Sequence, residues 1–348
     1  MIHFFPTFSK EAKTSPFARE LASLGVNHKL FPGEIVLRYR SRIWLVLMGW
    51  PKLFLFATQS AIRSLFLSKP YPDTVVIGSH IEGLVFGLFR LLRFKRNPEI
   101  VLLGFILTSR PSRFANALRT HYFKFIFSFI DKVICYSSHE VNRYRSIFQN
   151  SRSEFLYVPF GLHVEGRIKE NFQESTRHRE RPFILSAGRS GRDYATLFQA
   201  VADQDIDVHV VCDNESAVAG LEVPNNVSLL RHCYGKDYID EIINSLFVVI
   251  PLKVNDISAG QMVLLQAMAF GKSTVVTKTT TIEEYVADGK ESLLVEFGNA
   301  DSLRSAIEKL IVDKNLVITM GKSALAAYEN KFSMKAYVFH VVRCITLR

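Results

Sequence analysis

The sequence is short of cysteine and of low-complexity segments, and both shortages exclude classes of protein. Its four cysteines lie far apart, with no CxxC pair and no histidine cluster at metal-ligand spacing, so neither a disulfide framework nor a zinc site is expected. This cysteine pattern indicates a reducing, cytoplasmic setting. With 348 residues, of which 48% are hydrophobic, the chain is long enough for two α/β domains with large cores. The same composition excludes a disordered chain.

A secretory leader and a clear membrane span are also missing. The first residues, MIHFFPTFSKEAKTS, lack a basic stretch followed by a long apolar core, so no signal peptide is expected. The most apolar segment, residues 40–67, has Pro51 and Lys52 near its centre. A lysine there costs about 3 kcal/mol in a bilayer core, and a proline breaks backbone hydrogen bonds. Two alternatives stay open for this segment: a pair of core helices, or a helix in the membrane interface with Trp and Arg anchors.

Negative charge is scarce in the first half of the chain. Residues 1–180 hold 26 Lys and Arg against 13 Asp and Glu, whereas residues 181–348 hold 17 against 20. This asymmetry suggests that only the first half faces a polyanion, either a membrane surface or a nucleic acid. Few aromatic side chains accompany the loop cations, which argues against a nucleic acid. The expected partner is an anionic membrane surface, and the expected location is cytoplasmic, peripheral to the inner face of the membrane.

Short β-rich apolar runs alternate with helical patterns along the whole chain, which is typical of parallel βαβ units. We predict six strands in the first half, from IHFF to FLYVPF, and six in the second, from FILSAG to SLLVEF. The polar, charged segment 161–182 reads as a linker. The predicted fold class is α/β, with two Rossmann-like doubly wound domains, residues 1–160 and 183–332. They would face a cleft at the carboxyl ends of their strands.

The stretch DISAGQMVLLQAMAFGKSTVV, residues 256–276, predicts a loop and then a helix that ends at Gly271. Ser258 and Gln261 have the spacing of a capping box. A cap does not account for Gly260, because glycine in the first turn costs about 1 kcal/mol relative to alanine. A phosphate bound to bare helix amides would account for it. Gln266 suits ribose hydroxyls; the alternative is a glutamine bonded to neighbouring backbone.

These motifs carry a family resemblance. SAGRSGRDYATLFQAV, followed in order by FVVIPL, AMAFGK, EEYVADG and a closing FS, makes most of residues 183–333 similar to the donor half of a GT-B glycosyltransferase of the "glycosyl transferases group 1" type. The resemblance implies that the second domain binds a nucleotide diphosphate sugar. It also implies that the C-terminal helix, residues 333–348, crosses back onto the first domain.

The family has two glutamates eight residues apart, where this sequence has Ser258 and Gln266. Because neither is a carboxylate, the retaining stereochemistry that is usual with both glutamates does not carry over. The resemblance matches Arg189 to a family arginine and Arg192 to a family lysine. Two such cations would neutralise a diphosphate without a metal ion. The predicted donor-binding residues are Arg189, Arg192, Ser258, Ala259, Gly260, Gln261 and Gln266.

The acceptor site is expected in the first domain, where His80 and Glu82 follow the predicted strand TVVIG. A histidine and a glutamate there can take the proton of an acceptor hydroxyl, and relatives often have a histidine after a comparable strand. The alternative is that these residues only cap or cover a helix. Arg110, Arg113 and the lysines Lys10 and Lys13 lie in further loops that would line the acceptor side.

The sequence therefore predicts a metal-independent glycosyltransferase with no cofactor other than its nucleotide diphosphate sugar donor. The acceptor would be a hydroxyl of a lipid-linked or cell-surface glycan precursor. Two alternatives remain: a nucleotide-sugar epimerase of the same fold, which would need no basic acceptor lobe, and a non-catalytic glycosyltransferase-like partner protein.

Overall fold

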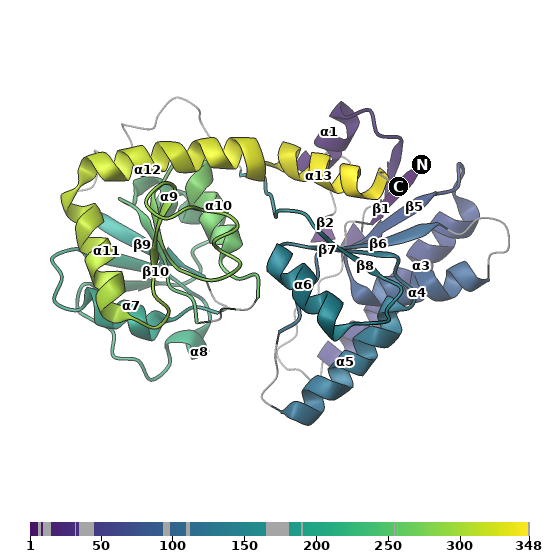
Figure 1. Cartoon of the computed structure of the whole chain (residues 1–348), viewed down its shortest axis with the longest axis horizontal. Coiled ribbons are helices and arrows are strands. Elements are labelled where there is room, and N and C mark those ends of the chain that lie inside the picture. Colours follow the sequence, from purple (N-terminus) through teal and green to yellow (C-terminus); the bar gives the residue numbers. More distant parts are fainter. Residues whose placement is uncertain are drawn as a thin grey trace. The chain divides into compact units, whose positions relative to one another are not determined.

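The computed structural model describes residues 1–5, 8–9, 15–31, 33–34, 45–92, 98–108, 112–164, 181–188, 191–253, 255 and 257–346. The chain divides into two compact units (Figure 1). Unit 1 comprises Met1–Pro159 and Tyr337–Arg348, and unit 2 comprises Phe160–Ala336. Most of the predicted linker, residues 165–180, lies outside the described residues.

Unit 1 is built on a six-stranded parallel sheet with the order β3-β1-β5-β6-β7-β8. Its strands are β1 (Ile2–Phe5), β3 (His28–Leu30), β5 (Thr74–Ile77), β6 (Glu99–Leu103), β7 (Lys132–Cys135) and β8 (Glu154–Tyr157). Each coincides with a predicted strand. Because β1, β5 and β7 are buried along their whole length, they read in the sequence as continuous apolar runs, as strands covered on both faces do. A short antiparallel pair, β2 (Phe8–Ser9) with β4 (Gly33–Glu34), was not predicted.

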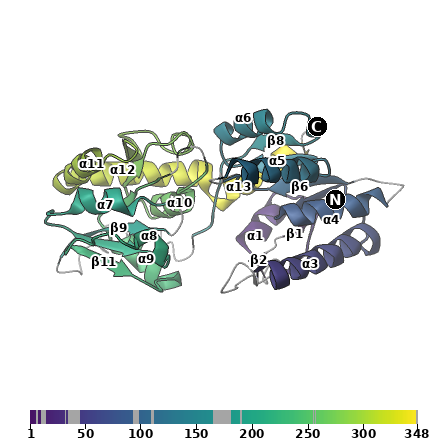
Figure 2. The ribbon, with the colours of Figure 1, turned by 90° about the horizontal axis from the view of Figure 1, so that it is seen from below.

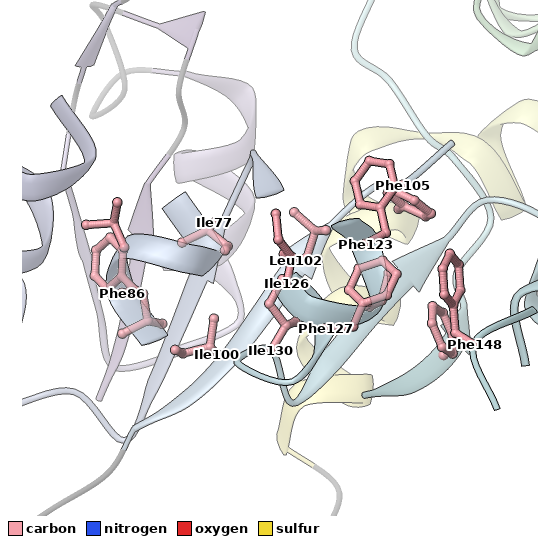
Figure 3. Close-up of a cluster of buried hydrophobic side chains, with 14 of the residues drawn as sticks. Ile77, Phe86, Ile100, Leu102, Phe105, Phe123, Ile126, Phe127, Ile130 and Phe148 are labelled. Carbon is pink, nitrogen blue, oxygen red and sulfur yellow. The ribbon is translucent and has the colours of Figure 1, made fainter. Parts of the chain in front are cut away.

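The helices of unit 1 are α1 (Pro16–Ser23), α3 (Trp50–Ile62), α4 (His80–Leu91), α5 (Arg113–Phe127) and α6 (Ser138–Ile147). Serines at positions 15, 79, 112 and 137 cap α1, α4, α5 and α6, which is why each helix begins where it does. Phenylalanines fill the core between sheet and helices: Phe105 lies edge-on to Phe123 and Phe127, at ring-centroid distances of 4.9 and 5.1 Å (Figure 3).

The apolar segment around α3 is one continuous helix rather than a pair. η1 (Leu45–Gly49) and η2 (Arg63–Leu67) extend α3 without a break at either end. Pro51 lies inside this continuous helix, directly after the π-helical turn Leu45–Gly49, and does not interrupt it. Leu53, Ala57 and Ala61 are buried, and α3 packs against α4 (Figure 2). Within the described ranges no helix is long and apolar enough to cross a bilayer.

Unit 2 has a second six-stranded parallel sheet, with the order β11-β10-β9-β12-β13-β14. Its strands are β9 (Phe183–Ala187), β10 (Asp207–Val211), β11 (Val227–Leu230), β12 (Val248–Ile250), β13 (Thr274–Thr277) and β14 (Ser292–Val295), again as predicted. Its helices are α7 (Tyr194–Val201), α8 (Glu215–Val218), α9 (Gly235–Asn244), α10 (Gln261–Ala269), α11 (Ala300–Val312) and α12 (Lys314–Ala327), with η4 (Tyr328–Phe332). Both units are thus the doubly wound α/β sheets that the sequence predicts.

The last helix, α13 (Met334–Thr346), begins in unit 2, and from Tyr337 onward it belongs to unit 1. The hydroxyls of Tyr337 and Tyr136 lie 3.4 Å apart, and Lys132 Nζ donates to the carbonyl of Cys344 at 3.3 Å. These contacts hold the helix on unit 1 at the ends of β7.

The strand orders locate the points where ligands of open α/β sheets bind, which are the carboxyl ends of the strands where the order reverses. In unit 2 the order runs outward from β9 through β10 to β11, and then returns to β12 on the other side of β9. In unit 1 the corresponding reversal lies between β1 and β5. The loops after β9, β12 and β5 therefore lie where a ligand is expected to bind.

Candidate functional site

Helix α10 begins at the reversal point of unit 2, directly after the loop that follows β12. Its N-cap is Gly260, with φ of 87°. Residues that have a Cβ disfavour this left-handed conformation. A Cβ at this position would come 3.2–3.4 Å from the side chains of Leu252 and Ile250. Both the backbone conformation and the tight packing therefore require glycine here.

The N-cap at Gly260 also overturns the predicted capping box. A box from Ser258 to Gln261 would start the helix two residues earlier, but the left-handed turn at Gly260 delays it. The first helical hydrogen bond runs from Leu264 N to Gly260 O at 3.0 Å. Gly260 has no side chain to accept hydrogen bonds from the N–H groups before Leu264, which helix geometry leaves without an intrahelical partner. These amides and the helix dipole make a site suited to an anion.

Gln261, the first residue of α10, adds an unusual buried amide to this site. Its side chain is 6% exposed, and its Nε2 has no hydrogen-bond partner among the described residues. Leaving a buried donor unsatisfied costs about 1–3 kcal/mol, so such groups in native proteins call for an explanation. Because this atom is buried, a ligand oxygen would reach it only if the side chain turned toward the start of α10.

The loop after β9 is fastened to the loop after β12. Arg192 Nε donates to Ala187 O at 2.8 Å, and Asp193 N donates to Pro251 O at 3.1 Å. Gly188, with φ of 126°, lies so close to the Arg192 guanidinium that a Cβ there would come 2.5–2.6 Å from it. The two loops on either side of the reversal point are thus held as one structure.

Arg192 differs from its predicted role. Its side chain is almost fully buried, and burial lowers its pKa. The Arg192 guanidinium packs against Gly188 and holds the loop after β9. It is not extended toward solvent, where a diphosphate would bind. Arg189, the second predicted cation, lies outside the described residues.

Gln266 has a partner that the sequence did not reveal. Tyr238 Oη, from α9, donates to Gln266 Oε1 at 3.1 Å. Burial raises the pKa of Tyr238, and the neighbouring Arg192 guanidinium opposes this shift only in part, so the hydroxyl stays protonated and donates. With its oxygen engaged, Gln266 presents its amide nitrogen as a donor. The sequence also allows a hydrogen bond from Gln266 to neighbouring backbone, but the observed partner is the Tyr238 side chain. No sequence signal marks Tyr238, because it reads as an ordinary inward position of an amphipathic helix.

Threonines of and after β13 fix the loop that carries Ser258 and Ala259. Leu252 N donates to Thr277 Oγ1 at 2.9 Å, and Thr281 Oγ1 donates to Ile257 O at 3.2 Å. At the far end of α10, Gly271 N donates to Met268 O and Lys272 N donates to Ala267 O, each at 2.9 Å. This is the Schellman arrangement predicted for Gly271. The helix is therefore fixed at both ends, and its uncapped start is held in place.

In unit 1, Glu82 closes the capping box of α4. Its Oε2 accepts hydrogen bonds from Gly78 N at 3.1 Å and Ser79 N at 3.0 Å, while Ser79 Oγ accepts from Glu82 N at 3.2 Å. The side chain is fully buried. The sequence predicts that Glu82 helps His80 to remove a proton. In the structure the Glu82 carboxylate instead accepts the hydrogen bonds of the capping box at the start of α4. It therefore fixes the backbone at the start of the helix that carries His80.

His80 is the first residue of α4, at the carboxyl end of β5. Its ring packs edge-on against Tyr122 and Phe123 of α5, at 5.9 and 5.3 Å between centroids. Burial, and to a lesser degree the Arg119 guanidinium, lower its pKa below the ordinary value of 6.5. The imidazole is therefore uncharged at neutral pH and able to accept a proton. Of the other loop residues, Arg113 starts α5, and Arg110, Lys10 and Lys13 lie outside the described residues.

No group of three His, Cys, Asp or Glu side chains that could hold a metal ion occurs among the described residues. The candidate site of unit 2 brings together the backbone amides at the start of α10, the side-chain amides of Gln261 and Gln266, the Tyr238 hydroxyl and the buried Arg192 guanidinium.

Two doubly wound α/β units with a phosphate-type helix terminus at the reversal point define the class: the chain has the GT-B fold. Residues 167–326 match the family model Glycosyl transferases group 1.

Known proteins are similar to this chain in sequence or in fold. An uncharacterized glycosyltransferase of Methanocaldococcus jannaschii is 25% identical over 231 residues, which are 64% of this chain and 61% of that protein. A glycosyltransferase from Rickettsia africae superposes with a TM-score of 0.69 at 14% identity, covering 99% and 97% of the two chains. WaaG, a glycosyltransferase involved in lipopolysaccharide biosynthesis, gives 0.61 at 13% identity over 99% and 100%. Anabaena HepE in complex with UDP-glucose gives 0.68 at 14% identity over 99% of each chain.

Proposed function

We propose that this protein transfers a sugar from a nucleotide diphosphate sugar to an acceptor hydroxyl, without a metal ion. The observation that carries the proposal is the start of α10, where Gly260 leaves the first helix amides uncapped at the reversal point of unit 2. Such a terminus stabilises the diphosphate in the ground state. It stabilises the leaving nucleoside diphosphate more, because negative charge grows there as the glycosidic bond breaks.

Each predicted donor residue receives a role in this proposal. The amides at the start of α10 and the buried Gln261 amide bind the diphosphate, together with the Arg189 side chain. Gln266, oriented by Tyr238, donates to a ribose hydroxyl. Ser258 and the Ala259 backbone lie where a sugar hydroxyl would be met. Arg192 holds the Gly188 turn beside them.

In unit 1 we assign the acceptor step to His80. Its lowered pKa leaves the imidazole neutral at pH 7, and the Glu82 capping box fixes the backbone that carries it. A neutral imidazole at a strand end can take the proton of an acceptor hydroxyl as that oxygen attacks the sugar.

The finer identity of donor and acceptor is also part of the proposal. HepE was solved with UDP-glucose, so UDP and UDP-glucose are the first donor ligands to test. WaaG acts in lipopolysaccharide biosynthesis, and unit 1 is strongly basic. Both observations support an acceptor that is a lipid-linked or cell-surface glycan precursor at the cytoplasmic face of the membrane.

A donor-binding measurement tests the proposal. Isothermal titration of the full chain with UDP should show saturable binding at one site, and Arg189→Ala should weaken it about 10-fold or more, since a charge-assisted hydrogen bond contributes roughly 1.5–3 kcal/mol. Lys309→Ala, which removes an exposed cation on α11 of the same unit, serves as the control and should bind normally. Unchanged UDP affinity in Arg189→Ala would remove the predicted cation from the site. No binding at all to a panel of nucleoside diphosphates would end the proposal.

One observation favours a second candidate, a non-catalytic partner protein. Both family glutamates are replaced, by Ser258 and Gln266. A protein of this kind would still bind UDP but would neither hydrolyse nor transfer the sugar of any donor. Release of UDP from UDP-glucose over long incubation, abolished by Arg189→Ala, would exclude this candidate.

A further inference from the structure

Unit 1 exposes far more apolar surface than unit 2. Among the described residues, 24 large apolar side chains are well exposed, and 18 of them belong to unit 1. Six on the α3–η2 segment, α4 and α5 are more than half exposed: Leu55, Leu67, Leu91, Phe114, Leu118 and Phe125. We call these six the three-helix surface. Single exposed apolar residues are normal, but a contiguous group marks a binding surface.

Aromatic contacts join the three helices that carry this surface. Phe66 of η2 lies edge-on to Phe89 of α4, at 6.2 Å. Phe125 of α5 lies edge-on to Phe129, at 5.3 Å, and the Phe129 ring in turn packs on Gly87 of α4. Figure 2 shows α3 and α4 side by side in unit 1. The three helices that carry the exposed side chains therefore pack against one another in a single layer of unit 1.

On α5 the apolar side chains form one outward stripe. Phe114, Leu118 and Phe125 are separated by four and seven residues, so they fall within about 40° around the helix axis. Arg113 and Lys124, both exposed, lie beside this stripe, about 100° away on one side. An amphipathic helix of a globular protein normally turns its apolar face inward. α5 has a buried face as well, so the outward stripe needs a partner of its own.

The α3–η2 segment repeats this arrangement. Leu55 and Ile62, seven residues apart, share one face of the helix, and both are exposed. Leu53 and Ala57 on the opposite side are buried. Arg63 is exposed beside Ile62. The segment therefore has an inner face for the core of unit 1 and a second apolar face toward solvent, bordered by positive charge.

The charge of this region has one sign. Residues 35–130 contain 14 Lys and Arg but only three acidic residues, and each acid is engaged elsewhere. Asp73 pairs with the N-terminal ammonium at 2.9 Å, Glu82 caps α4, and Glu99 lies 3.1 Å from Lys132 Nζ. Arg90 of α4 pairs with Asp131, but among the described residues Arg63, Arg113 and Lys124 have no acidic partner, so the cations that border the three-helix surface are uncompensated.

We propose that the three-helix surface docks on an anionic lipid bilayer. Its leucines and phenylalanines would enter the interface, and the flanking Arg and Lys would meet the headgroup phosphates. A second copy of the chain does not fit, because two such surfaces would bring like charges together. A nucleic acid would use the cations but would leave the exposed leucines in water. The inference deepens the proposed function, since it gives the route by which a lipid-linked acceptor would be reached, but bilayer binding can be measured without any transfer activity.

Vesicle co-sedimentation of the full chain tests the proposal. The probes are vesicles of phosphatidylcholine alone and of an equal mixture of phosphatidylcholine and phosphatidylglycerol. We expect binding to the anionic vesicles, weakened by salt, and little binding to the neutral ones. Phe114→Ser with Leu118→Ser and Phe125→Ser should lower the partition coefficient on the order of 100-fold. Arg63→Gln with Arg113→Gln and Lys124→Gln should lower it by a similar factor.

Matched variants in unit 2 keep the test falsifiable. Phe297, Val312 and Ile318 are comparably exposed, so their triple change to Ser controls for general loss of apolar surface. Lys309, Lys314 and Lys322, changed to Gln, control for general loss of charge. Equal binding by the surface variants and their controls would overturn the proposal, as would absence of binding to anionic vesicles.

Other occupants of the surface would give different results. A concentration-dependent dimer that is lost in the triple apolar variant would assign the surface to self-association. Tight RNA binding that the apolar triple does not affect would assign it to a nucleic acid. UDP titration of the same variants separates these outcomes from failure of the proposed function.

Discussion

The two units share a sheet architecture and differ in what surrounds it. Both have six parallel strands with one reversal of strand order. Unit 1 carries 24 Lys and Arg against 9 Asp and Glu, while unit 2 carries 19 against 24. The fold supplies the same place for a ligand in each unit, at the strand ends of the reversal point. The chemical groups at that place differ between the units. Unit 1 has a neutral histidine on α4, and unit 2 has the backbone amides of α10 with two glutamine side chains. Shared architecture therefore says where to look, and the local residues say what binds.

The largest expected effect separates the two units by reaction step. His80→Gln should lower kcat by about 10²–10⁴-fold, the usual contribution of a general base, while UDP affinity stays unchanged because His80 belongs to unit 1. Its folded pKa lies below 6.5, so the base form predominates at and above pH 6.5 and is lost only as the pH falls through that lowered pKa. The rate of the unchanged protein should therefore decline on the acid side, and the variant should lack that limb.

Steady-state rates with a short-chain acceptor analogue across a range of pH, combined with UDP titration, measure both halves of this prediction. A variant that retains the full rate and the same acid limb would show that another group accepts the proton. Loss of UDP affinity in His80→Gln would instead contradict the division of labour between the units.

An intermediate effect is expected from paired glycine substitutions. In Gly188→Ala, the positive φ and the clash with the Arg192 guanidinium should destabilise unit 2 by about 1–3 kcal/mol and weaken UDP binding about 10-fold or more. Gly104→Ala is the matched change in unit 1, since Gly104 has φ of 82° and its Cβ would meet the Tyr136 hydroxyl. It should destabilise unit 1 and leave UDP affinity intact.

Urea unfolding and UDP titration of both variants decide the matter. The comparison fails if the two glycine variants lose UDP affinity equally, because a general loss of stability would then explain both. It is sharpened if only Gly188→Ala does.

The sequence predicts those features of the structure that a local residue pattern determines. It does not predict those that depend on packing between distant segments. The central strands were found because strands buried on both faces are largely apolar runs. The edge strands β3, β8 and β11 are partly exposed and were found because β-rich residues stand between turn residues. The end of α10 was found for a similar reason, since Gly271 is a local signal. The start of the same helix was placed two residues early. What sets it is the left-handed turn at Gly260, at a position where Leu252 and Ile250 leave little room for a Cβ, and no local pattern contains that packing.

The candidate site was predicted less completely than the fold, for the same physical reason. Ser79 and Glu82 have capping-box spacing, yet the position after a strand favoured a catalytic interpretation of Glu82. Only the full burial of its carboxylate decides for the cap. Arg192 was read as a ligand contact because its burial beneath Gly188 depends on how two distant loops meet. Tyr238 was missed altogether, since it reaches Gln266 from a different helix.

The smallest expected effect concerns that tyrosine, and it tests how the site of unit 2 compensates for the absent glutamates. A carboxylate at position 266 would accept hydrogen bonds from ribose, whereas the glutamine, with Oε1 engaged by Tyr238, can only donate from Nε2. Tyr238→Phe removes one neutral hydrogen bond, which contributes about 0.5–1.5 kcal/mol, and frees the amide to rotate. UDP affinity should fall roughly 3- to 10-fold, while Gln266→Ala should cost at least as much. Because both changes act on one interaction, the double variant should be no weaker than Gln266→Ala alone. Calorimetric titration of the three variants gives this cycle directly, and additive losses would mean that Tyr238 acts on the nucleotide by another route.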